Sequence, residues 1–427
     1  RSDAVRLAAV CLLLAACRTA AVDPPDAAQS PQASAEPAPL ANVTTAATGT
    51  GTETSADARP PAEALRGDRS VPADAPREVR ELGGKEPRAD SRELAGYAMQ
   101  AVLHAGEGPP APKGPEVNAL AIDAAKRKLE ARIAIEASPT RARFVLSAGF
   151  VLPQGTELRS RVDRWGELLF LPDQGTYRVA EEGALRALLG ERRLDVAPLS
   201  AAEIATPGEG ARRLNLRTRR VDVTTRAAKA TLELAAFAGI GDGGELVCRF
   251  LLDLVGAAPS TAACSTDEVP LHAELHWTTQ GALFFDVTSI ARRADLPVAD
   301  LATPPPTASF TAEPLPESAG ETLLARNELA SMRTAAVDVP PSGPRDAQPP
   351  PPDAGMVLVN AGDELRVAWL DGVPAAWVAP GARIALPSLL RGRYTVQWRT
   401  FLGDAWDAPQ TVTVPGESIT GKEASAK

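Results

Sequence analysis

Apolar and polar residues alternate along several short segments between residues 115 and 300, which is the spacing of strands with one buried face. Such alternation is typical of antiparallel sheets, because one face of these sheets can stay in water. The segments are RARFVLSAGFVL, GELLFLP, TYRVA, RRVDVTTRA, ATLELAAFA and the hairpin LHAELHWTTQGALFFDVTSI. Helical spacing recurs in EVNALAIDAAKRKLEA, EEGALRALLGERR and ELVCRFLLDLVG. We therefore predict an α+β domain over residues 115–300, with an antiparallel sheet at its centre.

A second patterned region, residues 355–416, predicts a small all-β module of sandwich-like form. ELRVAWLDGVP contains Asp371-Gly372, a dipeptide that strongly favours a tight hairpin turn. In RYTVQWRTF, alternation places Tyr394, Val396 and Trp398 on one face of a strand. The chain is therefore expected to carry two folded regions.

The remaining segments lack this patterning. Residues 17–91 and 301–354 are rich in Ala, Pro, Thr and Ser, a composition that cannot bury enough apolar surface to fold, so both are predicted to be disordered linkers. Within the second linker, ETLLARNELASMR predicts a short helix. Residues 92–114 are expected to form a short helix and a proline-rich break, and residues 417–427 a disordered tail.

The N-terminal residues have the features of an export signal. Arg1 and Arg6 precede an uncharged run over residues 7–16, half the length that a membrane-spanning helix needs. Leu14-Ala15-Ala16-Cys17 resembles the lipobox of bacterial lipoproteins. The resemblance implies cleavage of a signal peptide at residues 1–16, acylation of Cys17 and a lipid-anchored tether over residues 17–91. Arg18, in place of the Asp that retains such proteins at the inner membrane, favours the outer membrane. The alternative is a general secretory signal with an incidental cysteine.

Charge and cysteine content narrow the class of protein. A net charge of −9 argues against a nucleic-acid partner, which needs a basic face. In an exported chain, Cys248 and Cys264 are predicted to form a disulfide that closes a loop of about 15 residues and contributes about 3 kcal/mol. Two unlinked thiols are the alternative.

The C-terminal region also resembles a known family. VAWLDGVPAAWVAPGARIALPSLLRGRYTVQW is similar to PEGA-type surface β-modules, with matches at Asp371, Gly372, Leu389, Gly392, Tyr394 and Val396. The resemblance implies an extracytoplasmic, non-catalytic module.

Three side chains form the most distinctive candidate site. His272, Glu274 and His276 in LHAELHW point to one face if this segment is a strand, and side chains spaced in this way can supply zinc ligands. The alternative is a solvated strand face. His104, the remaining histidine, is expected to lie far from them.

The glycines of AGIGDGGELV have the spacing of a dinucleotide-binding turn. Asp242 and Glu245, however, would set negative charge where a pyrophosphate binds, so we interpret this segment as a turn and expect no nucleotide or other cofactor.

Four tryptophans lie in the C-terminal module. Trp369 and Trp398 are expected to point into its core, whereas Trp377 and Trp406 are candidates for exposed rings that stack on envelope sugars.

The sequence thus favours a cell-envelope lipoprotein with a non-catalytic binding or assembly role, whose partners are the membrane, an envelope polysaccharide or an envelope protein. A metal-dependent enzyme and a periplasmic sensor or regulator are the alternatives.

Overall fold

The structure is a computed structural model that describes residues 93–114, 117–147, 151–162, 167–180, 183–194, 196–297, 304–333 and 355–420. All of these belong to one compact unit, Leu65–Lys427. The signal peptide, the lipidation site Cys17 and the tether up to residue 91 lie outside the described residues, as do residues 421–427 of the expected tail.

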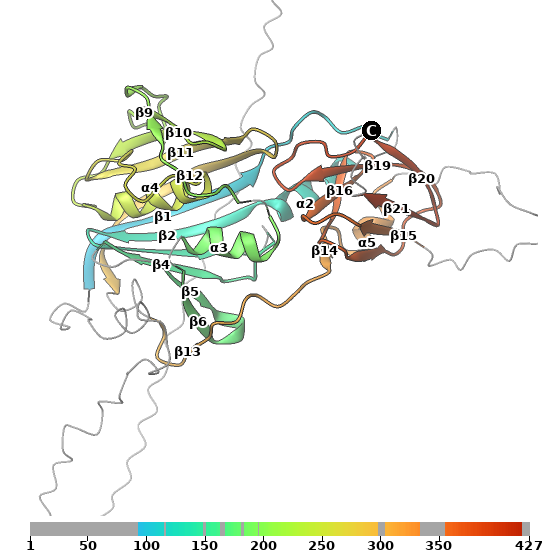
Figure 1. The fold of residues 1–427 in the computed structure, drawn as a ribbon, viewed down its shortest axis with the longest axis horizontal. Helices are drawn as coiled ribbons and strands as arrows, with labels where there is room; N and C mark the ends of the chain where they lie inside the picture. Colours follow the sequence, from blue (N-terminus) through green and yellow to red (C-terminus); the bar gives the residue numbers. More distant parts are fainter. Residues whose placement is uncertain are drawn as a thin grey trace, which may run out of the picture. The chain divides into compact units, whose positions relative to one another are not determined.

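A 13-stranded sheet dominates the first part of the chain (Figure 1), in the order β13-β6-β5-β4-β3-β2-β1-β12-β11-β10-β9-β7, with β8 paired to β9. All its pairs are antiparallel except the short pair of β13 and β6. The strands are β1 (Glu93–Ala105), β2 (Ala131–Ser138), β3 (Arg141–Leu146), β4 (Glu157–Arg161), β5 (Glu167–Leu171), β6 (Thr176–Ala180), β7 (Glu203–Ile204), β8 (Gly208–Glu209), β9 (Arg219–Thr224), β10 (Ala228–Ala236), β11 (Glu268–Trp277), β12 (Gly281–Pro297) and β13 (Ser309–Phe310), with a 3₁₀ turn η1 (Pro172–Gln174). The predicted α+β class with antiparallel sheets is confirmed.

Two helices cover the inner face of this sheet. Helix α4 (Gly243–Leu254) contacts β2, β3, β4 and β11, and α3 (Ala184–Glu191) contacts β5, β6 and α4. Phe250 of α4 stacks on Phe144 of β3 with ring centroids 4.6 Å apart. The core is built from the alternate strand residues that point toward the helices, such as Leu103, Ile133 and Phe285. The opposite face of the strands carries their polar residues.

The prediction of a short helix within residues 92–114 is wrong, because residues 93–105 form β1. The strand lies in the middle of the sheet, between β2 and β12. Met99, Ala101 and Leu103 are buried and alternate with Gln100, Val102 and His104. The period-two pattern was therefore present, but Ala, Met, Leu and Gln are strong helix formers and concealed it.

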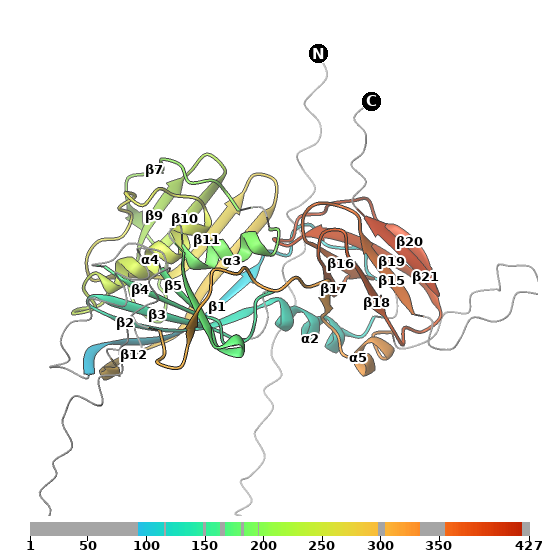
Figure 2. The same ribbon diagram turned by 60° about the horizontal axis from the view of Figure 1, so that its bottom comes forward.

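The C-terminal module contains two sheets that share a core, as a sandwich does (Figure 2). A five-stranded sheet has the order β14-β17-β16-β19-β20, and a three-stranded sheet the order β18-β15-β21. Asp371 and Gly372 form the predicted tight turn with positive φ angles of 50° and 85°. The elements are α2 (Ala119–Leu129), β14 (Gly320–Thr322), α5 (Arg326–Ala330), β15 (Met356–Asn360), β16 (Arg366–Leu370), β17 (Val373–Val378), β18 (Arg383–Leu386), β19 (Gly392–Thr400), β20 (Gln410–Val414) and β21 (Gly416–Thr420).

The C-terminal module includes segments that the sequence pattern had placed in the central domain, in a linker and in a tail. Helix α2, from the predicted central domain, packs Ala121 and Ala125 into the module's core. Residues 304–333 are not a disordered linker, since β13 and β14 pair in the sheets and Leu324 and Met332 are buried in the same core. The short helix predicted there is confirmed as α5. Residues 417–420 belong to β21 and not to a tail. Each of these segments contributes only a few apolar residues, so patterning alone could not place them.

The predicted disulfide is confirmed. Cys248 of α4 is bonded to Cys264 in the loop before β11, with Cα atoms 6.3 Å apart. It ties α4 to the strand on which the helix packs. Among the described residues, no helix is long and apolar enough to cross a membrane.

Candidate binding site

The outer face of the 13-stranded sheet brings together all three histidines of the chain. His104 on β1 lies opposite Phe284 on β12, and His272 on β11 lies opposite Asp286 on β12. The expectation that His104 lies far from the other two is therefore wrong. It depended on residues 92–114 being outside the sheet, whereas β1 is a direct neighbour of β12.

Two carboxylates link the three imidazole rings. His272 Nδ1 lies 2.7 Å from Asp286 Oδ1, and His104 Nε2 lies 3.8 Å from Asp286 Oδ2. On the other side, Glu274 lies between His272 Nε2, at 3.4 Å, and His276 Nε2, at 3.5 Å. The ring of Phe284 packs against His104 and His276, with centroid distances of 5.3 and 5.9 Å. We call these five charged or titratable residues the histidine network.

The contacts between the rings and the carboxylates set the charges of the network. The ion pair with His104 and the hydrogen bond with His272 hold the pKa of Asp286 well below its usual range. The bond to Asp286 raises the pKa of His104 and of His272, and outweighs the opposing effect of burial in both. Burial raises the pKa of Glu274, but the bonds from its two histidine neighbours lower it overall. His104 and His272 are therefore both stabilised in their protonated forms by Asp286.

The arrangement gives the metal hypothesis little support. The prediction that His272, Glu274 and His276 share a face is confirmed by their contacts. Within the described part of the chain, however, no group of three or more His, Cys, Asp or Glu side chains could hold a metal ion. The carboxylates lie between the rings and bond to their nitrogens, so the nitrogens do not converge on one point. His272 is buried, whereas Glu274 and His276 are partly exposed.

Replacing Asp286 with Asn is expected to lower the pKa of both His104 and His272, because each loses its carboxylate partner. A histidine whose pKa is raised on folding stabilises the fold fully below its usual value of 6.5, and this contribution is lost as pH rises through the folded pKa. A depressed Asp pKa contributes above the usual 3.8 and is lost as pH falls. The wild-type chain should therefore lose more stability between about pH 6 and pH 9 than Asp286→Asn does.

Proton NMR titration of the three histidines measures the pKa values, and urea unfolding measures the stability. Asp222→Asn on β9 is the control, because Asp222 pairs with Arg220 and Thr231 and not with a histidine. Equal histidine pKa values in wild type and Asp286→Asn would contradict the network.

A cavity of about 330 Å³ opens beside His104, within the usual size of small-molecule pockets. It lies where the end of β1, helix α2 and β12 meet β16 and β19 of the C-terminal module. Its lining combines aromatic or aliphatic side chains with a few charged ones: His104, Glu107, Lys126, Leu129, Glu130, Phe284, Val367, Trp369, Thr400 and Phe401, with backbone from Ala105, Gly106 and Gly403. We call this the β1–α2 pocket.

The positive groups of the β1–α2 pocket already have anionic partners. Lys126 Nζ lies 2.5 Å from Glu107 Oε1, and this bond holds the pKa of Glu107 below its usual value. His104 is paired with Asp286. The carboxylate of Glu130, in contrast, has no hydrogen bond or ion pair to any described residue. The pocket therefore offers the Glu130 carboxylate as an acceptor, together with aromatic faces.

Arg399 holds one wall of the pocket. Its guanidinium donates hydrogen bonds to the carbonyl oxygens of Glu107, Pro109 and Gly403 and lies 4.6 Å from the ring centre of Trp369. It thereby ties residues 107–109 to β19. Nothing in the sequence marked Arg399 or the pocket, because the pocket depends on contacts between segments far apart in the chain.

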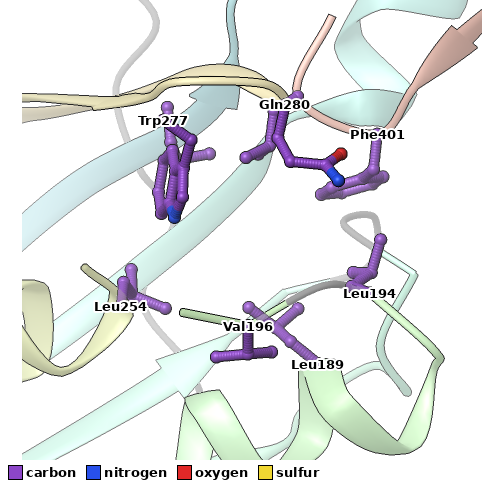
Figure 3. Close-up of a pocket in the computed structure, with 9 residues that line it drawn as sticks. Leu189, Leu194, Val196, Leu254, Trp277, Gln280 and Phe401 are labelled. Carbon is purple, nitrogen blue, oxygen red and sulfur yellow. The ribbon is translucent and has the colours of Figure 1, made fainter. Parts of the chain in front are cut away.

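A second cavity is small and mostly apolar, with the polar Gln280 in its lining (Figure 3). Its volume is about 30 Å³, and its lining includes Leu189, Val196, Leu254, Trp277 and Phe401. That volume holds about one or two water molecules. We interpret it as a packing defect of the core.

The two tryptophans proposed for sugar stacking do not form an exposed pair. Trp377 lies in β17, between β14 and β16, and is only 5% exposed, so that part of the prediction is wrong. Trp406 is 44% exposed, but Arg366 covers one face of its ring at 3.7 Å. Trp398 is buried in the module's core as expected. Trp369 is also buried, but it packs with the core of the large sheet and lines the β1–α2 pocket, so its expected place in the module's core is wrong.

The side chain of Asp267 lies in the glycine turn before α4. The backbone N–H groups of Gly239 and Gly241 donate to Asp267 Oδ1 at 3.1 and 2.6 Å. A Cβ on Gly243 would lie 1.9 Å from the carbonyl oxygen of Ser138, so this glycine allows α4 to approach β2. A carboxylate thus lies where a dinucleotide would place a phosphate.

Comparison with known proteins gives no family. No family model and no curated protein matches the chain. Among solved structures, "Structure of PNGF-II in C2 space group" is similar at a TM-score of 0.27 and 8% identity, over 52% of this chain and 31% of that one. The chain thus spans less than a third of that structure's length, and a likeness this weak carries no argument.

Proposed function

We propose that this protein is a cell-envelope lipoprotein with a non-catalytic role, which binds a neutral or amino-bearing saccharide of the envelope in the β1–α2 pocket. The observation that carries the proposal is the pocket itself. Its volume of about 330 Å³ and its mixture of apolar walls and few polar groups are typical of ligand sites.

The lining favours a hydroxyl-rich ligand. Trp369 and Phe284 offer flat apolar surfaces against which the C–H face of a sugar ring can pack. The free carboxylate of Glu130 accepts hydrogen bonds and cannot donate them when ionised. Since Lys126 and His104 are already paired with carboxylates, phosphate or carboxylate ligands gain little there.

The envelope setting is supported by two features. The lipobox-like Leu14-Ala15-Ala16-Cys17 implies acylation at Cys17. The Cys248–Cys264 disulfide is typical of proteins that fold in an oxidising compartment. Lipid anchoring at the outer membrane, and the PEGA-like character of the C-terminal module, belong to this same proposal.

Calorimetric titration of the full chain carrying Cys17→Ser with soluble peptidoglycan fragments and neutral hexose oligomers tests the pocket. At least one of these ligands should bind, and Glu130→Gln should weaken its binding about tenfold, the effect of losing about 1.4 kcal/mol from a charged hydrogen bond.

Glu209→Gln is the matched control, because Glu209 is exposed on β8, away from the pocket. Absence of binding to all these saccharides, or equal affinity for Glu130→Gln and the parent chain, would overturn the proposed site.

A further inference from the structure

The connection between β8 and β9 is a tight hairpin that projects beyond the sheet. Pairing continues past the strands through Gly210 and Thr218 to a pair of backbone bonds between Arg213 and Leu216. Leu214 and Asn215 form the turn itself, with φ angles of 48° and 65°. We call residues 211–217 the arginine–leucine tip.

Hydrogen bonds with Glu233 and Thr218 hold the arginine–leucine tip in place. Glu233 on β10 accepts hydrogen bonds from the backbone N–H of Ala211 and from Nε of Arg213. The hydroxyl of Thr218 donates to the carbonyl oxygen of Ala211. Because these bonds fix the hairpin, little conformational freedom remains to be lost when a partner binds.

The tip exposes apolar and basic side chains together. Leu214 and Leu216 are 40% and 36% exposed. Arg212 and Arg217 flank them, are exposed, and form no hydrogen bond or ion pair with the residues that the structure describes.

The neighbouring arginines are neutralised. Arg213, Arg219 and Arg220 pair with Glu233, Glu268 and Asp222. On a chain of net charge −9, the tip is therefore a local site of unpaired positive charge around two leucines.

We propose that the arginine–leucine tip binds the surface of an anionic phospholipid bilayer, with Leu214 and Leu216 entering the interface and Arg212 and Arg217 pairing with lipid phosphates. Exposed leucines beside arginines are the combination that favours the headgroup region of such membranes. Guanidinium groups also bind phosphate oxygens by paired hydrogen bonds.

A protein partner fits the tip less well. A stable protein interface buries at least about 1,000 Å², more than a single two-residue turn and its flanks offer. A bilayer, in contrast, adapts to a small convex insertion.

The affinity of the tip alone for the bilayer is expected to be low. A lipid anchor would increase the apparent affinity, because it raises the effective concentration of the tip at the membrane. That gain depends on the proposed acylation of Cys17, whereas binding by the tip itself does not.

Co-sedimentation of the full chain carrying Cys17→Ser with lipid vesicles tests the tip. The chain should bind vesicles of mixed phosphatidylglycerol and phosphatidylcholine and should not bind vesicles of phosphatidylcholine alone. Leu214→Ser with Leu216→Ser, and separately Arg212→Gln with Arg217→Gln, should each reduce binding about tenfold or more. The arginine variant should also flatten the dependence on salt.

Arg383→Gln with Ile419→Ser is the matched control, because both side chains are exposed on the C-terminal module. Circular dichroism checks that each variant stays folded. Equal binding by the tip variants and the control, or equal binding to both kinds of vesicle, would overturn the proposal. Tip-dependent binding to immobilised polyglutamate without binding to anionic vesicles would also overturn it, in favour of an acidic protein partner. None of these variants touches the β1–α2 pocket, so this result is independent of the saccharide titration.

Discussion

Arg399→Met is expected to lower the free energy of unfolding by about 3–5 kcal/mol, because it removes hydrogen bonds from a charged donor, each of which contributes about 1.5–3 kcal/mol. Arg399 is buried and donates to the carbonyl oxygens of Glu107, Pro109 and Gly403. Methionine keeps much of the side-chain volume, so the loss reports on the hydrogen bonds and the cation–π contact with Trp369. Urea unfolding followed by circular dichroism measures the change.

Arg383→Met provides the matched control. Arg383 is 71% exposed and pairs with Glu417 at the surface, where ion pairs contribute about 1 kcal/mol or less. Because Arg399 holds a wall of the β1–α2 pocket, its replacement should also abolish saccharide binding under conditions in which the chain remains folded. A cost for Arg399→Met as small as that for Arg383→Met would show that the wall is held by other contacts.

Asp371→Ala is expected to cost about 3–5 kcal/mol of stability, because it leaves the buried guanidinium of Arg333 without its counter-charge. Asp371 Oδ2 accepts two hydrogen bonds from Arg333, at 2.8 Å and 2.5 Å. Its other oxygen accepts from the backbone N–H of Thr395 at 2.9 Å. The ring of Tyr394 stacks on the same guanidinium at 3.7 Å. Thermal and urea unfolding both measure the effect.

Two companion variants separate the contributions. Asp363→Ala removes an exposed carboxylate in the same module and should change stability by no more than about 0.5 kcal/mol. Asp371→Asn tolerates the positive φ angle and can still accept from Thr395, so it tests the ion pair apart from the turn. If Asp371→Ala costs no more than Asp363→Ala, the buried pair with Arg333 does not stabilise the module.

Local patterns in the sequence predicted much of the secondary structure. Alternation located the hairpin of β11 and β12, helical spacing located α3 and α4, and Asp371-Gly372 located the turn between β16 and β17. These elements depend on neighbours within a few residues. β1 was missed because its inward residues are Met, Ala and Leu, which favour a helix in isolation and form a strand only between β2 and β12.

Only the residues of the candidate site that lie on one strand could be predicted from the sequence. The shared face of His272, Glu274 and His276 follows from their spacing on one strand. The addition of His104 and Asp286 depends on the pairing of β1 with β12, a register that no single segment encodes. Without Asp286, the three side chains suggested metal ligands. In the fold, His272 bonds to Asp286, and Glu274 contacts both His272 and His276.

The β1–α2 pocket and the role of Arg333 lay beyond sequence patterning for the same reason. Helix α2 and residues 320–333, which include β14, pack into a module whose other strands begin only at Met356. Domain boundaries drawn from composition separated these parts, whereas the fold combines them. The charge balance of the pocket appears only once Lys126 lies beside Glu107.

The most direct test of the envelope-lipoprotein account is the intact mass of the protein extracted from the membranes of a bacterial host, with Cys17→Ser measured beside it. The wild-type protein should yield a mature chain that begins at Cys17 and carries acyl mass, and the variant should lack that species. A mature wild-type chain without acyl mass, cut elsewhere, would contradict this expectation.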